Sequence, residues 1–408
     1  MVVRLFICLF FYSLSVNATE VHERRLANGL KVLVKEQHRS PVVVSQIWYK
    51  VGSSYESSGI TGVSHMLEHM MFKGTDNHPA GEFSKIIAEN GGRENAFTGR
   101  DYTAYFQTLE KSRLAISFEL EADRMQHLHL LAEELKKELQ VVMEERRMRT
   151  EDRPRAKLQE HLMALAYSSS PYKNPVIGWA ADIEQYTVAD LAQWYKQWYA
   201  PNNATLVVVG DVQAAAVFKL AEHYFGKVSS RALSVVKSQT EIAQLGVRRM
   251  TVKLPAKVPY ILMAYKVPSL QTLTKEQSWE AYALDVLAAV LDGGDSARLP
   301  SRLQRGQQIA SSVGAGYDLG ARLEELFLFE ATPAKGKSLL DMEQALKTEI
   351  RVMQRELVSV KELARVKAQV LASSVYEQDS LFYQAMKLGM AETVGLGWQT
   401  SEQYREKI

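Results

Sequence analysis

Two successive stretches of this chain repeat one order of expected elements: strands, a helix, further strands and then long helices. In the first stretch, residues 42–49 and 204–211 are rich in β-branched residues, which is typical of strands. Residues 112–131 and 132–149 instead carry apolar residues at helical spacing. The same order returns after residue 248, although direct residue identity is too weak to establish a repeat. The sequence therefore predicts an α+β fold of two similar domains, each a mainly antiparallel sheet packed against helices.

Length and composition agree with two globular domains. A chain of 408 residues is long for one hydrophobic core, and 46% hydrophobic and 24% charged residues are ordinary for a soluble protein. Residues 229–247 lose clear periodicity and are interpreted as a linker. We therefore expect an N-terminal domain at 19–228 and a C-terminal domain at 248–408, the latter opening with strands at 248–254 and 260–267.

Residues 1–18 have the pattern of a secretory signal peptide. Arg4 lies in a short basic start, an apolar run follows from Leu5 to Leu14, and residues 16–18 form a small-residue cleavage site. The apolar run is too short to span a bilayer as a stable anchor, although an uncleaved N-terminal anchor is the alternative. The only cysteine, Cys8, lies in this segment, so the mature chain would hold no cysteine to bind a metal. Export without a disulfide predicts a bacterial periplasmic protein.

No other stretch is apolar for long enough to cross a membrane, so no span is expected after cleavage of the signal peptide. The formal net charge of +2 comes without a sustained basic stripe. Nucleic-acid binding needs such a stripe to neutralise phosphates. We therefore expect no nucleic-acid partner.

The segment His65-Met66-Leu67-Glu68-His69 carries the strongest chemical signal. On a helix, positions i, i+3 and i+4 share one face, so both imidazoles and the carboxylate converge. Two histidines one turn apart are natural zinc ligands, and a carboxylate that does not bind the metal can accept a proton from the water that zinc activates. This is the inverse of the order His-Glu-x-x-His. A solvated helix face that meets the pattern by chance is the alternative.

A zinc peptidase of this kind needs a third protein ligand and one position left for water. The predicted helix at 132–149 offers Glu138 and Glu145, which are seven residues apart and project from the same face. Glu144 points elsewhere. A charge-rich helix is most often a solvated face, so the residues alone leave that reading open.

With these motifs and residues 25–30, the chain resembles the pitrilysin/insulinase family of zinc peptidases, which includes the mitochondrial processing peptidase and short bacterial relatives. The resemblance implies that His65, His69 and Glu145 hold one Zn²⁺ per chain and that Glu68 is the catalytic base. It also implies that Glu138 orients a ligand or helps to shuttle protons. The expected function is zinc-dependent endopeptidase action on peptides or unfolded protein segments.

The resemblance further assigns Asn95, Ala96, Phe97 and Thr98 to an exposed strand edge that binds substrate. A peptide adds to such an edge as an extra strand, so main-chain hydrogen bonds supply affinity that depends little on side chains. An ordinary strand leading into Asp101 is the alternative.

One segment departs from the family pattern. Active single-chain members carry an arginine and, seven residues later, a tyrosine that grips the substrate backbone, whereas this chain has Gln304 and Ser311 there. Arg305 and Tyr317 lie nearby at the wrong spacing. The resemblance therefore implies half of a clamshell, the zinc-bearing subunit of a heterodimer whose paralogous partner lacks the zinc motif and keeps the arginine–tyrosine clamp. A homodimer is the alternative.

A rival class is a non-catalytic interaction subunit of the same fold. Such subunits lose motif residues, whereas every zinc and base position is intact in this chain. Relatives usually run some tens of residues longer, so a truncated second unit at Ile408 is also expected.

Overall fold

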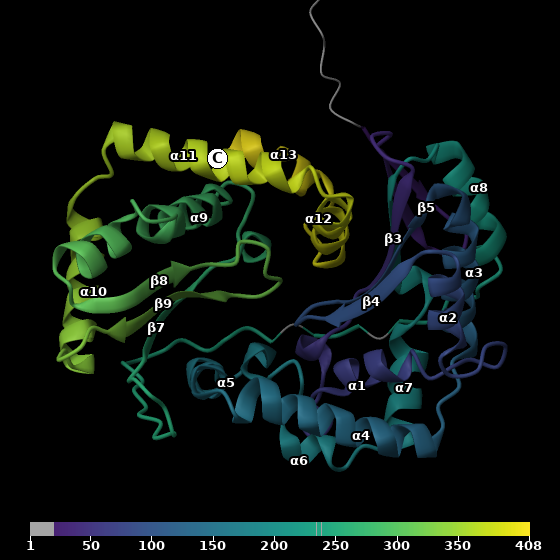
Figure 1. Ribbon diagram of the computed structural model, residues 1–408, viewed down its shortest axis with the longest axis horizontal. Helices are drawn as coiled ribbons and strands as arrows, with labels where there is room; N and C mark the ends of the chain where they lie inside the picture. Colours follow the sequence, from purple (N-terminus) through teal and green to yellow (C-terminus); the bar gives the residue numbers. More distant parts are fainter. Residues whose placement is uncertain (1–19, 234, 238) are drawn as a thin grey trace, which may run out of the picture.

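The structure, a computed structural model, describes residues 20–233, 235–237 and 239–408. The predicted signal peptide at 1–18 thus lies outside the described residues. The described chain folds into two units, each built on a β-sheet with helices against it, and they lie side by side in Figure 1. Within these residues, no helix combines the length and apolar character needed to cross a membrane.

The first sheet has six strands in the order β1-β2-β6-β3-β5-β4. Every neighbouring pair is antiparallel except β2 and β6, which run parallel. The strands of this mainly antiparallel sheet are β1 (Val21–Arg25), β2 (Lys31–Glu36), β3 (Val42–Tyr49), β4 (Arg93–Thr98), β5 (Thr103–Glu110) and β6 (Ala204–Gly210). Strand β4 forms one edge of the sheet, and an edge strand can accept a further strand beside it.

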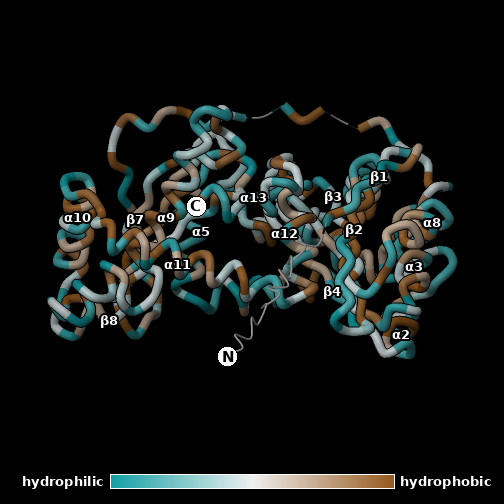
Figure 2. The backbone as a smooth tube through the Cα atoms, turned by 90° about the horizontal axis from the view of Figure 1, so that it is seen from above, coloured by the Kyte–Doolittle hydropathy of each residue, from teal (hydrophilic) through white to brown (hydrophobic). Residues whose placement is uncertain are grey.

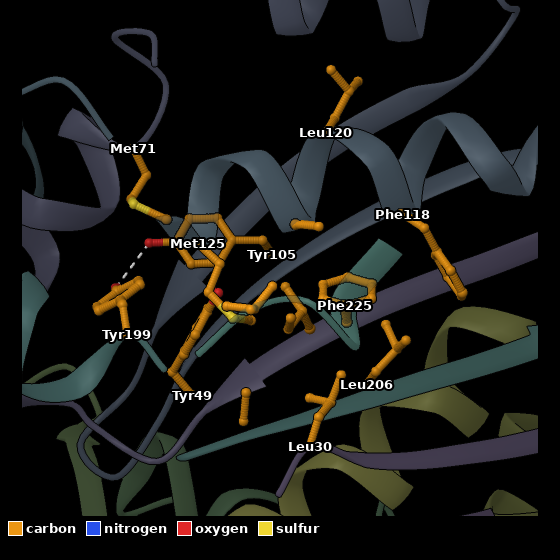
Figure 3. Packing of buried hydrophobic residues seen from close by; sticks show 14 of the residues in the cluster. Leu30, Tyr49, Met71, Tyr105, Phe118, Leu120, Met125, Tyr199, Leu206 and Phe225 are labelled. Carbon is orange, nitrogen blue, oxygen red and sulfur yellow. Dashed lines mark hydrogen bonds between the residues drawn. The ribbon is translucent and has the colours of Figure 1, made fainter. Parts of the chain in front are cut away.

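Alternate side chains of these strands supply two separate cores, because successive residues point to opposite faces. On one face, Val32, Ile47 and Leu206 pack in the largest hydrophobic cluster, where Tyr105 and Tyr199 join their hydroxyls at 3.0 Å (Figure 3). The helices that contribute to this cluster are α1 (Val63–Met70), α2 (Glu82–Glu89), α3 (Leu114–His127), α4 (Ala132–Arg146), α6 (Ala180–Ile183), α7 (Val188–Trp198) and α8 (Ala214–Phe225).

The second sheet has three antiparallel strands, β7 (Ile261–Val267), β9 (Glu325–Pro333) and β8 (Ala310–Gly316), in that order. A second hydrophobic cluster joins this sheet to its helices. The helices of this unit are α9 (Trp279–Asp292), α10 (Leu339–Arg355) and α11 (Val360–Glu377). The expected strand at 260–267 is therefore present as β7.

The strand predicted at 248–254 is wrong, because these residues have no regular structure. Side chains rather than backbone hold the segment: Arg248 donates to the carbonyls of Leu165 and Ala166, and Arg249 pairs with Glu343 at 2.6 Å. Alternating composition is not enough for a strand, which also needs a neighbouring strand to complete its hydrogen bonds.

The two units exchange helices. Helix α5 (Pro154–Ala166) leaves the first unit and packs on β7, while α12 (Leu381–Thr393) returns to cover β3 and β6. Figure 1 shows α12 between the sheets, and the view from above in Figure 2 places it beside β3 as well. A Cβ at Gly389 would lie 2.2 Å from the Trp48 indole nitrogen, so only glycine allows this close approach. The chain continues as α13 (Gln399–Lys407).

Candidate metal centre

Helix α1 presents the predicted motif because its other face is committed to the core. Val63, Met66 and Met70 are completely buried in the main hydrophobic cluster. The helix N-terminus is satisfied by Glu56, whose carboxylate accepts hydrogen bonds from the backbone N–H groups of Gly62 at 2.6 Å and Ser64 at 2.9 Å. Fixed in this way, the helix directs the motif side chains away from the core.

Helix α4 supplies the third predicted ligand in the same manner. Leu135 and Val142, seven residues apart, are buried in the core. Glu138 and Glu145 have the same seven-residue spacing, so both project from one neighbouring face of the helix. Helices α1 and α4 are in contact and lie side by side in Figure 1. Glu144 is not part of the group that could hold a metal and pairs with Arg147 at the surface.

The structure brings His65, His69 and Glu145 together. One ligating atom from each lies within 4.8 Å of the other two. The Glu145 Oε2 is 3.7 Å from the His65 Nε2 and 3.4 Å from the His69 Nε2. The two imidazole rings have centroids 4.8 Å apart and planes inclined at 62°. Two nitrogens and one oxygen thus surround one point, the arrangement that a catalytic zinc site offers with one position left open.

A second observation supports a fit between these three side chains and zinc. The Glu145 Oε2 is buried and has no hydrogen-bond partner among the described residues. A buried acceptor without a donor costs about 1–3 kcal/mol, and a bound cation would remove that cost. Imidazole nitrogens and a carboxylate oxygen are also the ligand types that zinc takes when no cysteine is present.

The two histidines differ in their electrostatic surroundings. Burial, reinforced by the charge of His69, lowers the pKa of His65 to about 4, so this imidazole is neutral with its Nε2 facing Glu145. Burial also acts to lower the pKa of His69, but the Glu138 and Glu145 carboxylates beside its ring outweigh it and raise the value to about 9. The His69 Nδ1 lies 3.0 Å from the Glu138 Oε2, so the Nε2 is the nitrogen that faces Glu145 and would bind a metal after losing its proton.

Glu68 lies beside the three grouped residues and is not one of them. Its carboxylate accepts a hydrogen bond from the Thr98 hydroxyl of strand β4. Burial raises the pKa of Glu68 above its ordinary value, although the Thr98 hydrogen bond opposes the shift. A carboxylate with a raised pKa is a better proton acceptor near neutral pH than an exposed one.

The predicted substrate strand lies beside this centre. Asn95, Ala96, Phe97 and Thr98 form the end of edge strand β4, which among the described residues pairs with β5 alone. The same cleft of about 1580 Å³ is lined by these four residues and by His65, Glu68, His69 and Glu145. Phe97 packs on Trp48, with ring centroids 5.3 Å apart, and so faces away from Thr98 across the sheet.

The positions expected for the missing clamp lie in the second unit. The Gln304 side chain donates to the Ser311 carbonyl at 3.0 Å, where the π-helical turn Pro300–Gly306 leads into β8. The neighbouring candidates are engaged elsewhere, since Arg305 donates to the Asp295 carbonyl and the Tyr317 hydroxyl to the Pro268 carbonyl at 2.7 Å. Because these contacts hold both side chains, neither Arg305 nor Tyr317 takes the place of the arginine–tyrosine pair.

Sequence reasoning missed Lys73, whose ammonium lies 2.6 Å from the Glu138 Oε1. A signal for it was present: Lys73 is four residues after His69, the spacing at which side chains near a helix end can lie close together. A carboxylate as buried as Glu138, with 6% of its surface exposed, needs a positive neighbour.

Known proteins resemble this chain in sequence and in structure. The family described as insulinase, peptidase family M16, matches residues 31–179, and the peptidase M16 inactive domain matches residues 185–370. Zinc protease PqqE of Helicobacter pylori is 36% identical over 310 residues, which cover 75% of this chain and 68% of that protein.

Solved structures share the fold. A protease from Helicobacter pylori superposes with a TM-score of 0.88 at 30% identity, covering 95% of this chain and 93% of that chain. The periplasmic protease PqqL from Escherichia coli gives a TM-score of 0.79 at 22% identity, covering 95% of this chain and 45% of that chain. The names of these relatives support a protease-type function. The chain belongs to the insulinase family of peptidases, peptidase family M16.

Proposed function

We propose that this protein is a zinc-dependent endopeptidase that cleaves peptides or unfolded protein segments. The observation that carries the proposal is the convergence of His65, His69 and Glu145 beside the separately held Glu68. The zinc protease names of relatives support a hydrolase of this class. One Zn²⁺ per chain would be held by the two Nε2 atoms and the Glu145 carboxylate.

Zinc, when bound, lowers the pKa of water and polarises the substrate carbonyl. Glu68 is the group of this chain that moves the proton. Its carboxylate accepts the proton from the attacking water and returns it to the nitrogen of the leaving amine. Thr98 holds that carboxylate from the neighbouring strand, so Glu68 does not need to reorganise during the reaction.

Substrate would lie along β4. The free edge of this strand offers main-chain N–H and C=O groups next to the metal centre, and an extended peptide can pair with them as a further strand. Residues 95–98 would thus bind backbone rather than side chains. This mode requires an extended chain, which excludes folded proteins from the site.

The partner we propose is a paralogous subunit that lacks the zinc motif and carries the arginine–tyrosine clamp. Gln304 and Ser311, which contact each other, supply neither group. Mixing the two subunits should raise the rate of peptide cleavage. A homodimer is the alternative, and it would be supported if the isolated chain ran as a dimer that cleaved unstructured peptides without help. We also propose periplasmic export directed by residues 1–18.

The alternative function is a non-catalytic subunit of the same fold. The match of residues 185–370 to a domain described as inactive favours it. The intact grouping of three ligands and the base in the first unit favours the enzyme.

Metal analysis separates these functions and tests the ligand assignment. Glu145→Gln should lose both zinc and hydrolysis, because it removes a ligand, whereas Glu144→Gln, one residue away and paired with Arg147, should keep both. Zinc bound equally by the wild type and Glu145→Gln would refute the assignment. A wild-type protein that binds one zinc but cleaves no peptide, alone or with its partner, would favour the non-catalytic subunit.

A further inference from the structure

Three side chains form a series of polar contacts that ends at the metal centre. The Lys73 ammonium forms an ion pair with the Glu138 Oε1 at 2.6 Å, and the Glu138 Oε2 lies 3.0 Å from the His69 Nδ1. Lys73 and His69 come from the C-terminal turn of α1 and the residues after it, whereas Glu138 comes from α4. The series therefore ties the two ligand-bearing helices together next to the site.

Glu138 is buried, so its charge needs compensation. Only 6% of the residue surface is exposed. The Lys73 ammonium lies against the Glu138 Oε1 and supplies that compensation, while the Oε2 is left to accept the Nδ1–H of His69.

The ion pair of Lys73 and Glu138 is more buried than a second ion pair at the same centre. Arg149 lies 2.6 Å from the Glu145 Oε1, but 70% of its side chain is exposed. Exposed pairs contribute little because water and salt screen them. The Lys73 side chain is 27% exposed and that of Glu138 only 8%, so removing Lys73 would leave a buried charge with one partner fewer.

We propose that Lys73 is a positioning residue of the metal centre: it holds the buried Glu138 carboxylate in place, and Glu138 in turn directs the His69 Nε2 at the metal. Partners of metal-bound histidines commonly fix the tautomer and ring orientation, and their loss costs about 10–100-fold in metal affinity. Lys73 contacts Glu138 rather than His69, so it acts on the proposed metal ligand through one intervening side chain. This inference rests on the proposed zinc site.

The first test compares Lys73→Met with Lys85→Met. Lys85 is an exposed lysine of α2 that faces Glu89 at 3.8 Å, so it controls for loss of a surface ammonium. Zinc affinity, measured by competition with a chelator, should fall on the order of 10-fold in Lys73→Met only. Lys73→Arg, which keeps the charge and donors, should recover most of the affinity. The visible absorption bands of the cobalt-substituted protein should shift in Lys73→Met and stay in place in Lys85→Met.

A second measurement on metal-free protein keeps the inference testable if zinc does not bind. Lys73→Met should lower the unfolding midpoint because it leaves Glu138 without its cation, whereas Lys73→Met combined with Glu138→Gln should lower it no further than Glu138→Gln alone. Wild-type zinc affinity and cobalt spectra in Lys73→Met would overturn the inference and leave the zinc site standing. Wild-type protein that binds no zinc would overturn the proposed function, and additive midpoint losses would then overturn the inference as well.

Discussion

The Thr98 hydroxyl donates a hydrogen bond to the Glu68 carboxylate, which joins the open edge of the first sheet to helix α1. The proposed substrate strand and the proposed base are therefore in direct contact. Because Thr98 is the residue of β4 that reaches Glu68, a peptide docking along β4 would meet the base at a fixed place.

Replacing Thr98 tests this contact. Thr98→Val keeps the shape and removes the donor, so kcat should fall by roughly 10-fold or more, as expected for a lost hydrogen bond to a charged group, while KM changes little. Thr98→Ser keeps the hydroxyl and should retain most of kcat. Steady-state kinetics with an unstructured fluorogenic peptide measures both. Equal kcat for Thr98→Val and wild type would show that the hydroxyl does not position the base.

Glu241, which lies in the segment between α8 and β7, should make stability depend on pH. Its carboxylate accepts hydrogen bonds from the backbone N–H groups of Ser168, Ser169 and Ser170 and pairs with Lys266 at 2.6 Å. Burial acts to raise its pKa, but the Lys266 contact and these N–H groups outweigh it and lower the pKa from 4.5 to about 2. A carboxyl whose pKa is depressed on folding stabilises the protein above its unfolded pKa, and that contribution is lost as pH falls.

Glu241→Gln should therefore lower the free energy of unfolding by roughly 2–3 kcal/mol at pH 6. The difference from wild type should shrink as pH falls below about 4.5 and nearly vanish toward pH 2. Urea unfolding of both proteins at several pH values measures this difference. A difference that stays constant from pH 6 to pH 3 would mean that the carboxylate charge does not anchor the segment between α8 and β7.

The part of the candidate site that lies on one helix could be predicted from residue spacing. The part that depends on contacts between segments distant in sequence could not. His65, Glu68 and His69 lie within one helical turn, so their convergence follows from spacing alone. Glu145 needed a family resemblance because its helix is remote in sequence. The Thr98 contact with Glu68 depends on how β4 and α1 pack, which no single-segment pattern records.

The fold shows the same division. The β-branched residues at 42–49 and 204–211 predicted strands β3 and β6, whereas β1 (Val21–Arg25) was not predicted, because its His22, Glu23 and Arg24 are polar. The segment at 248–254 has strand-like alternation but forms no strand, because pairing is a tertiary property. The exchange of α5 and α12 between the units could not be predicted, since an amphipathic helix does not specify which sheet it covers.

Gly389→Ala tests the docking of α12 on the first sheet. The added Cβ would meet the Trp48 indole at 2.2 Å, which overpacks a completely buried contact and should cost about 1–3 kcal/mol. Gly320→Ala is the control, because its nearest neighbour would lie at 3.5 Å. Thermal unfolding should show a lower midpoint for Gly389→Ala than for the control. Identical midpoints would mean that the helix shifts without cost and is not firmly seated.

The most direct test of the proposed enzyme is the zinc content and peptidase activity of Glu68→Gln, measured on one preparation with and without the proposed partner subunit. Glu68 is outside the ligand group, so the variant should retain one zinc per chain. Loss of the proton acceptor should reduce hydrolysis by roughly 10²–10⁴-fold. A zinc-loaded Glu68→Gln protein that cleaves peptides at the wild-type rate would contradict the assignment of Glu68 as the base.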